Sequence, residues 1–116
     1  MSIRRIGVGP RMSAAVVHGN TVYLAGQVAD KSKGAGVTEQ TKEVLSIIDA
    51  LLAQAGTDKT KILSATIYLP DISTFAQMNA AWDTWVAAGH TPARATVEAK
   101  LAAPDYKVEI AVIAAV

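Results

Sequence analysis

Two short apolar stretches near the start of the chain have the composition of β-strands. Residues 14–18 and 21–28 are rich in valine, leucine and alanine, and Gly19-Asn20 separates them. A two-residue loop that begins with glycine suits a type II′ hairpin turn. The chain is therefore predicted to open with an antiparallel hairpin, followed by an exposed, glycine-containing loop over residues 30–37.

The pattern then changes to helix, strand and helix. From Thr38, the expected N-cap, to Ala55, apolar residues recur at three- and four-residue steps, as the buried stripe of a helix requires. Residues 62–69 are apolar and β-branched and stop at Pro70, which predicts a third strand. A second helix, capped by Asp71 or Ser73, is expected to run to about Ala87.

Two further strands, over residues 94–101 and 107–116, complete the pattern. The order ββαβαββ predicts an α/β (α+β) fold, with a mixed sheet and both helices on one face. Two helices cover only one face of such a sheet, yet the last strand is apolar on both sides. The uncovered face is therefore expected to pack against another protein surface through self-association.

Length and composition narrow the class of protein. The 116 residues fit a single domain over residues 1–116. A net charge of +1 with scattered basic residues gives no footprint for nucleic acid, and the lack of cysteine excludes disulfides, thiolate metal sites and a cysteine nucleophile. Neither a signal-peptide core nor an apolar run of membrane-spanning length occurs, so a cytoplasmic protein without membrane contact is expected.

Several cofactor and catalytic motifs are missing. Gly7-Val8-Gly9 lacks the third glycine of a dinucleotide fingerprint, and His18 and His90 have no ligand at metal-binding spacing. No serine-hydrolase elbow, Walker loop or zinc-protease motif is present. We therefore expect no metal and no cofactor, and we interpret Trp82 and Trp85, at helical spacing, as packing residues.

The strand over residues 94–101 alternates in polarity. Its apolar side is predicted to face the core, which leaves Arg94, Thr96, Glu98 and Lys100 on the other side. An edge strand with one solvated face would account for this alternation. Arg94, at the mouth of the strand after Pro92, is either part of an internal ion pair or a guanidinium that grips a carboxylate with two parallel hydrogen bonds.

Glu109 lies alone within the apolar final strand. An unpaired buried carboxylate could cost roughly 3–5 kcal/mol, so a cation or several hydrogen-bond donors should lie nearby. One interpretation is a structural salt bridge to Lys100, Lys107 or an arginine. The other is a carboxylate that holds and polarises a water in a sheltered cleft.

Four segments resemble the reactive intermediate deaminase (Rid) family, also called the YjgF family, and the similarity runs through nearly the whole chain. They are Ala25-Gly26-Gln27-Val28, Phe75-Ala76-Gln77-Met78-Asn79, Pro92-Ala93-Arg94-Ala95-Thr96-Val97-Glu98 and Lys107-Val108-Glu109-Ile110. The resemblance implies a chorismate-mutase-like fold, assembled as a homotrimer with three clefts between subunits. It also implies cofactor-free hydrolysis of enamine and imine acids, such as 2-aminoacrylate, to 2-keto acids and ammonia.

The resemblance implies roles for individual residues. Arg94 matches the arginine that binds the substrate carboxylate, and Glu109 matches the carboxylate that positions the attacking water. Asn79 and Thr96 match positions that line the cleft, and Gly26 is expected to contact substrate as well. Many deaminating members carry a tyrosine where this chain has Arg11 after Gly9-Pro10, and that difference would favour a larger or doubly acidic substrate.

The expected activity is that of a 2-iminobutanoate/2-iminopropanoate deaminase-like hydrolase, with Arg94 and Glu109 as its catalytic residues. A non-catalytic protein that binds or senses small carboxylates on the same trimer is the alternative. RNA cleavage is disfavoured by the near-neutral charge. The deaminase hypothesis requires Arg94 and Glu109 to converge in one sheltered pocket, and separate environments for the two side chains would argue against it.

Overall fold

One mixed β-sheet forms the centre of the protein in a computed structural model that describes residues 2–116. Its strands are β1 (Ile3–Val8), β2 (Ser13–His18), β3 (Thr21–Leu24), β4 (Gln27–Val28), β5 (Ile62–Leu69), β6 (Ala93–Glu98) and β7 (Glu109–Ala115). Their hydrogen-bonded order is β1-β2-β3-β7-β5-β6, and the short β4 also pairs with β7. The β5–β6 pair is parallel and the other pairs are antiparallel.

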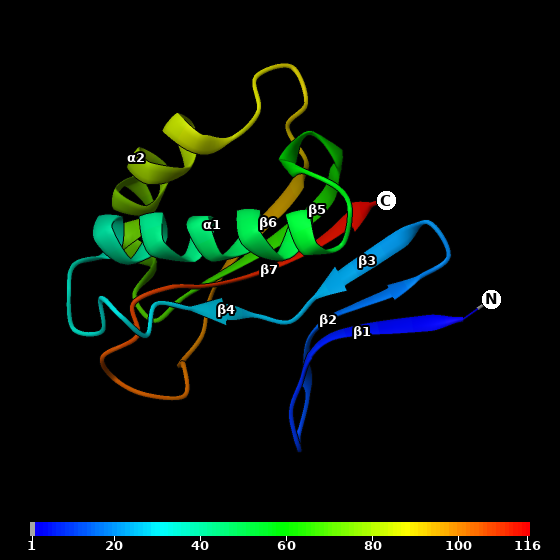
Figure 1. The fold of residues 1–116 in the computed structure, drawn as a ribbon. Helices are drawn as coiled ribbons and strands as arrows, with labels where there is room; N and C mark the ends of the chain where they lie inside the picture. The colour runs from blue at the N-terminus through cyan, green and yellow to red at the C-terminus, as the bar shows by residue number, and fades with distance from the viewer. Residues whose placement is uncertain (1) are drawn as a thin grey trace.

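Two helices, α1 (Val37–Gln54) and α2 (Phe75–Trp85), lie on the same side of the sheet (Figure 1). The single-turn 3-10 helices η1 (Lys59–Lys61) and η2 (Ile72–Thr74) lead into β5 and α2. The core between helices and sheet includes Val44, Leu45, Ile48 and Leu52 of α1, Met78 and Trp82 of α2, and Val22, Ile67, Ile110 and Val112 of the strands. The predicted mixed sheet with both helices on one face is confirmed. No helix within residues 2–116 is long and apolar enough to cross a membrane.

The N-terminal strands differ from the prediction in two ways. β1 was not predicted, because Arg4, Arg5 and Gly7 interrupt its apolar pattern, yet it pairs with β2 along the edge of the sheet. The expected single strand over residues 21–28 is divided into β3 and β4. The Gly19-Asn20 turn is confirmed, and its positive φ of 62° at Gly19 is the geometry that a type II′ turn needs.

The predicted helix caps were wrong by one to three residues, because α1 begins after Gly36 and α2 after Thr74. Gly36, not Thr38, is the N-cap of α1, because the Thr38 hydroxyl donates instead to the backbone carbonyl of Gln77 in α2 (2.9 Å). Asp71 caps η2 by accepting the backbone N–H of Ser73 (2.9 Å), and α2 ends at Trp85 rather than near residue 87.

The facing of β6 is opposite to the prediction. Arg94 and Thr96 pair in register with Ala65 and Ile67 of β5, which are buried beneath the helices. Residues 95 and 97, expected in the core, therefore lie on the uncovered face. The strand is also shorter than predicted, since it ends at Glu98, and β7 begins only at Glu109.

The uncovered face of the sheet carries large apolar side chains, as the sequence predicted. Tyr23 of β3 and Ile113 of β7 are register partners, with exposed fractions of 48% and 37%. Val97 of β6 is 42% exposed on the same face. Exposed neighbouring apolar groups of this size are typical of a surface that another protein covers.

Candidate functional site

Arg94 projects from β6, an edge strand, toward α2. Its Nη1 donates to Oδ1 of Asn79 (2.7 Å), and its Cζ lies 5.2 Å from the ring centroid of Trp82 and 5.5 Å from that of Phe75. The internal ion pair that the sequence left open is not found, because no carboxylate within residues 2–116 is within ion-pair distance of Arg94. The guanidinium is half-buried and held by neutral groups.

A single stripe of α2 supplies all these contacts. Phe75, Met78, Asn79 and Trp82 are spaced at i, i+3, i+4 and i+7, so they share one face of the helix. The Met78 sulfur lies 4.0 Å from Arg94 Nη1. Trp82 is a core residue, as predicted, but its contact with Arg94, and that of Phe75, was not predicted. The helical spacing of Phe75 and Trp82 with Asn79 could have indicated that the two rings share a helix face with this predicted site residue.

Thr96 lies two residues after Arg94 on the same face of β6. Its Oγ1 is buried and is the one such side-chain atom within residues 2–116 that has no hydrogen-bond partner. Leaving a buried hydroxyl unpaired costs roughly 1–3 kcal/mol. We call Arg94, its partner Asn79 and Thr96 on the same strand face the arginine half-site. Within residues 2–116 it has hydrogen-bonding capacity that is not used.

Glu109 and Gly26 meet at a second place. A methyl group on Gly26 would lie 2.1 Å from Oε2 of Glu109 and 2.8 Å from its Cδ, so the carboxylate packs directly against the glycine backbone. Glu109 is half-buried, and no basic side chain in the described part of the chain forms the predicted salt bridge with it. We call this pair the glutamate half-site.

The two half-sites lie on opposite faces of the sheet. Arg94 shares its face with Ala65 and Val112, which are buried beneath the helices, whereas Glu109 is in register with Tyr68 and Val97 on the uncovered face. Arg94 and Glu109 therefore do not converge within one chain, and their convergence in a cleft between subunits stays a prediction. The register partners of Arg94 and Glu109 on β5 are Ala65 and Tyr68. These two residues are three positions apart on one strand, so their side chains point to opposite faces.

Arg11 joins neither half-site. It is exposed in the turn between β1 and β2, where the backbone N–H of Gly9 donates to the carbonyl of Met12 (2.8 Å). Its side chain makes no hydrogen bond or ion pair with residues 2–116. A contribution of Arg11 to substrate binding stays a prediction.

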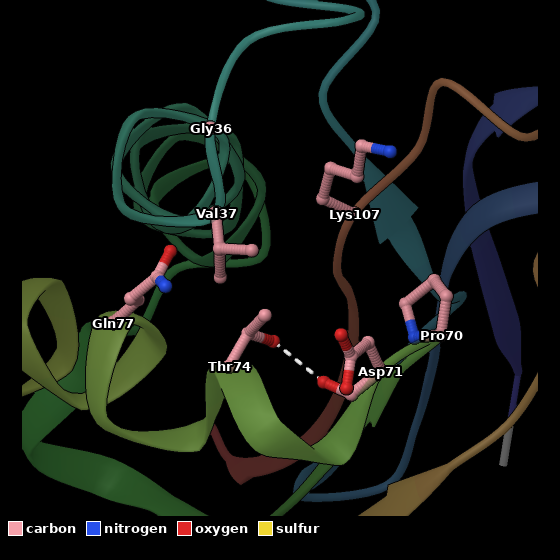
Figure 2. A pocket seen from close by; sticks show the side chains of 7 residues that line it. All are labelled: Gly36, Val37, Pro70, Asp71, Thr74, Gln77 and Lys107. Atoms are coloured by element: carbon pink, nitrogen blue, oxygen red, sulfur yellow. Dashed lines mark hydrogen bonds between the residues drawn. The ribbon is translucent and has the colours of Figure 1, made fainter.

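The chain also has a cavity of about 250 Å³ between the start of α1 and the η2–α2 segment (Figure 2). It is lined by Gly36, Val37, Pro70, Asp71, Thr74, Gln77 and Lys107. Hydrogen bonds from the hydroxyl and the backbone N–H of Ser73 hold the pKa of Asp71 below its ordinary value of 3.8. The cavity contains none of the predicted site residues.

The fold and the two half-sites define a single-domain α+β protein. Its edge strand carries an arginine that has no ion-pair partner within residues 2–116, and its uncovered sheet face carries a carboxylate. Residues 3–116 match the family described as Endoribonuclease L-PSP. A RutC family protein of Haemophilus influenzae is 51% identical over 114 residues, which cover 98% of each chain.

Solved structures and a further relative agree with this match. NMB1025 of Neisseria meningitidis, a member of the YjgF protein family, superposes with a TM-score of 0.95 at 48% identity, over 99% of this chain and 95% of that one. A 2-iminobutanoate/2-iminopropanoate deaminase of Capra hircus is 34% identical over 112 residues, 92% of this chain and 80% of the relative. The chain therefore belongs to the Endoribonuclease L-PSP (YjgF/Rid) family, as the four sequence segments predicted.

Proposed function

We propose that the protein hydrolyses small enamine and imine acids, of the 2-aminoacrylate type, to 2-keto acids and ammonia. The observation that carries the proposal is the half-buried guanidinium of Arg94, which has hydrogen-bond donors to spare and no carboxylate partner in the described chain. A planar guanidinium binds a carboxylate through two parallel hydrogen bonds. The relationship to the goat imine deaminase supports this choice of reaction.

The proposal requires a site between two copies of the chain, because one chain keeps Arg94 and Glu109 on opposite faces. Arg94 is on an edge strand, so it can reach a neighbour beyond that edge. Glu109 lies on the uncovered face, whose apolar side chains need a protein partner. If the edge of one copy packs on the uncovered face of the next, the contact is head-to-tail, and such contacts make a closed ring when their rotation closes. The homotrimer that the family resemblance implies is a ring of this kind.

In this cleft the substrate carboxylate pairs with Arg94, and Glu109 of the neighbouring copy holds a water near the imine carbon. An enamine such as 2-aminoacrylate first moves an N–H proton, through solvent, to its terminal carbon and becomes the imine. Water then adds to the imine carbon, so that its oxygen forms the C–O bond of a carbinolamine and one of its protons passes to nitrogen. Transfer of the remaining hydroxyl proton to nitrogen breaks the C–N bond and releases ammonia and the 2-keto acid. No cofactor is needed, because orienting the water and the substrate supplies most of the required acceleration.

Ammonia release from 2-aminoacrylate, generated by an added dehydratase, tests the proposal. Arg94→Ala should abolish the acceleration because the carboxylate loses its partner. Arg4→Ala is the control, since Arg4 is exposed and bonds only the Gln54 carbonyl (3.2 Å). An unchanged rate in Arg94→Ala would contradict the proposal.

The second candidate is a protein that binds or senses small carboxylates without turning them over. The position of Glu109 favours it, because in a single chain no catalytic carboxylate stands near Arg94. Pyruvate binding that depends on Arg94, together with no acceleration of any imine, would select this candidate. RNA cleavage, which the family description names, is opposed by the net charge of +1.

A further inference from the structure

Within residues 2–116, the side chains that bond or stack on Arg94 are uncharged. One amide oxygen, from Asn79, accepts one of its N–H groups, and the rings of Phe75 and Trp82 lie within cation–π distance. We propose that these three residues are positioning residues, which orient the guanidinium while leaving its charge free for an anionic ligand. The inference rests on the proposed role of Arg94 in binding a carboxylate.

Each neighbour attracts the cation without neutralising it. An aromatic face interacts with a guanidinium through its quadrupole, and an amide oxygen through its dipole. A carboxylate in the place of Asn79 would form an ion pair and compete directly with the ligand. The remaining donors of Arg94, Nε and Nη2, have no partner within residues 2–116, and they suit the two oxygens of one carboxylate.

The nearest acidic residue on the same strand face is engaged elsewhere. Glu98 follows Arg94 by four positions on β6, and its Oε2 accepts the backbone N–H of Ile72 at the start of η2 (3.0 Å). The carboxylate on that face thus binds the first backbone N–H of η2, and no carboxylate of residues 2–116 forms an ion pair with Arg94.

The decisive variant is Asn79→Asp, which keeps the shape of the side chain and adds a negative charge 2.7 Å from Arg94 Nη1. Isothermal titration with pyruvate should show binding weakened at least about tenfold, because a charge-assisted pair replaces a neutral one. The thermal midpoint should stay the same or rise. Affinity within twofold of the wild type would overturn the inference.

A second pair of variants separates positioning from folding. Phe75 is 40% exposed, so Phe75→Leu should fold with little change in thermal midpoint. Its pyruvate affinity should fall about threefold through loss of the cation–π contact, and Phe75→Tyr, which keeps a ring, should restore it. Equal affinities for the leucine and tyrosine variants would also overturn the inference.

Arg94→Gln distinguishes this inference from the proposed function. If Arg94→Gln binds pyruvate as tightly as the wild type, the carboxylate-binding role fails and the positioning role fails with it. If Arg94→Gln loses binding while Asn79→Asp and Phe75→Leu keep it, only the positioning role is wrong. Loss of binding in Arg94→Gln, together with the expected reductions in Asn79→Asp and Phe75→Leu and no fall in thermal midpoint, supports both.

Discussion

Gly26 sets how closely the backbone can approach Glu109. Its φ is not in the left-handed region, so backbone strain does not demand a glycine there. A glycine is required there because a methyl group would lie 2.1 Å from Oε2 of Glu109 and overlap the carboxylate. A residue expected to contact substrate thus also fixes the position of the carboxylate.

Gly26→Ala should therefore displace Glu109. Overpacking of this kind costs about 1–3 kcal/mol, measured by urea unfolding. The same change in a Glu109→Ala background should cost little, because the overlapping atoms are gone, and the difference between the two costs is the coupling energy. Equal costs in both backgrounds would show that the two residues do not constrain each other.

At the scale of single residues, the sequence predicted which residues form the candidate site better than it predicted where their side chains lie. The resemblance picked out Arg94, Asn79, Thr96, Glu109 and Gly26, which the structure gathers into two clusters. It did not predict that the clusters lie on opposite faces. Alternation along a strand separates two faces but does not say which one the helices cover, and β6 has its apolar side uncovered.

At the scale of elements, one side chain of α1 holds the connection into β7. Gln40 is fully buried, and its Nε2 donates to the carbonyls of Ala35 (3.0 Å) and Asp105 (2.8 Å). Its Oε1 accepts the backbone N–H of Lys107 (2.8 Å). The start of the strand that carries Glu109 is thereby tied to the helix layer.

Gln40→Leu should lower the free energy of unfolding by about 2–3 kcal/mol, since it leaves buried backbone groups unpaired. Chemical denaturation measures the loss, and hydrogen exchange should show that the Lys107 amide loses protection. Gln54→Leu is the control on the same helix, and because Gln54 is exposed its cost should stay within about 0.5 kcal/mol. A similar loss of stability in both variants would show that the Gln40 hydrogen bonds do not hold the connection into β7.

Glu43 ties the loop before α1 to that helix. Its carboxylate accepts the backbone N–H groups of Lys31 (3.0 Å) and Ser32 (2.6 Å) and the Ser32 hydroxyl (2.7 Å). Burial alone would raise the pKa of Glu43, but these hydrogen bonds outweigh it and hold the pKa below the ordinary 4.5. The stabilisation is therefore present above pH 4.5 and is lost as the pH falls through the lowered pKa.

Glu43→Gln should consequently be less stable than the wild type near pH 7, by about 1 kcal/mol. The difference should shrink as the pH drops below 4.5 and the wild-type carboxyl also becomes neutral. Thermal midpoints across this range measure the effect. Glu39→Gln, which removes only an exposed pair with Lys42 (3.7 Å), should show almost no difference at any pH.

Elements with a long apolar period were predictable, and short ones were not. Both helices follow from their three- and four-residue stripes, although their caps depend on tertiary contacts such as that between Thr38 and the Gln77 carbonyl. β1 and the 3-10 helices carry too few apolar residues to leave a period. Their formation depends on neighbours far away in the sequence.

At the scale of the whole molecule, the uncovered face should control self-association. Sedimentation should give the wild type a mass about three times the 12.1 kDa of one chain, as expected for a closed ring. Ile113→Glu, which buries a charge in the proposed interface, should shift the mass toward one chain. Ala53→Glu adds the same charge at an exposed site on α1, away from the sheet edge and its uncovered face, and should leave the mass unchanged. Dissociation in both variants, or in neither, would place the interface elsewhere.

A site made from two copies has a consequence that no single-chain site shares. Arg94→Ala and Glu109→Ala should each be inactive alone, because each removes one half-site from every cleft. In a trimer formed by unfolding and refolding equal amounts of both variants together, some clefts combine an intact Arg94 from one copy with an intact Glu109 from its neighbour. With random mixing, each cleft has a chance of about one half to receive an intact Arg94 and an independent chance of about one half to receive an intact Glu109. About a quarter of the wild-type rate should therefore return. If both groups acted within one chain, every cleft would keep a defect and the mixture would stay inactive.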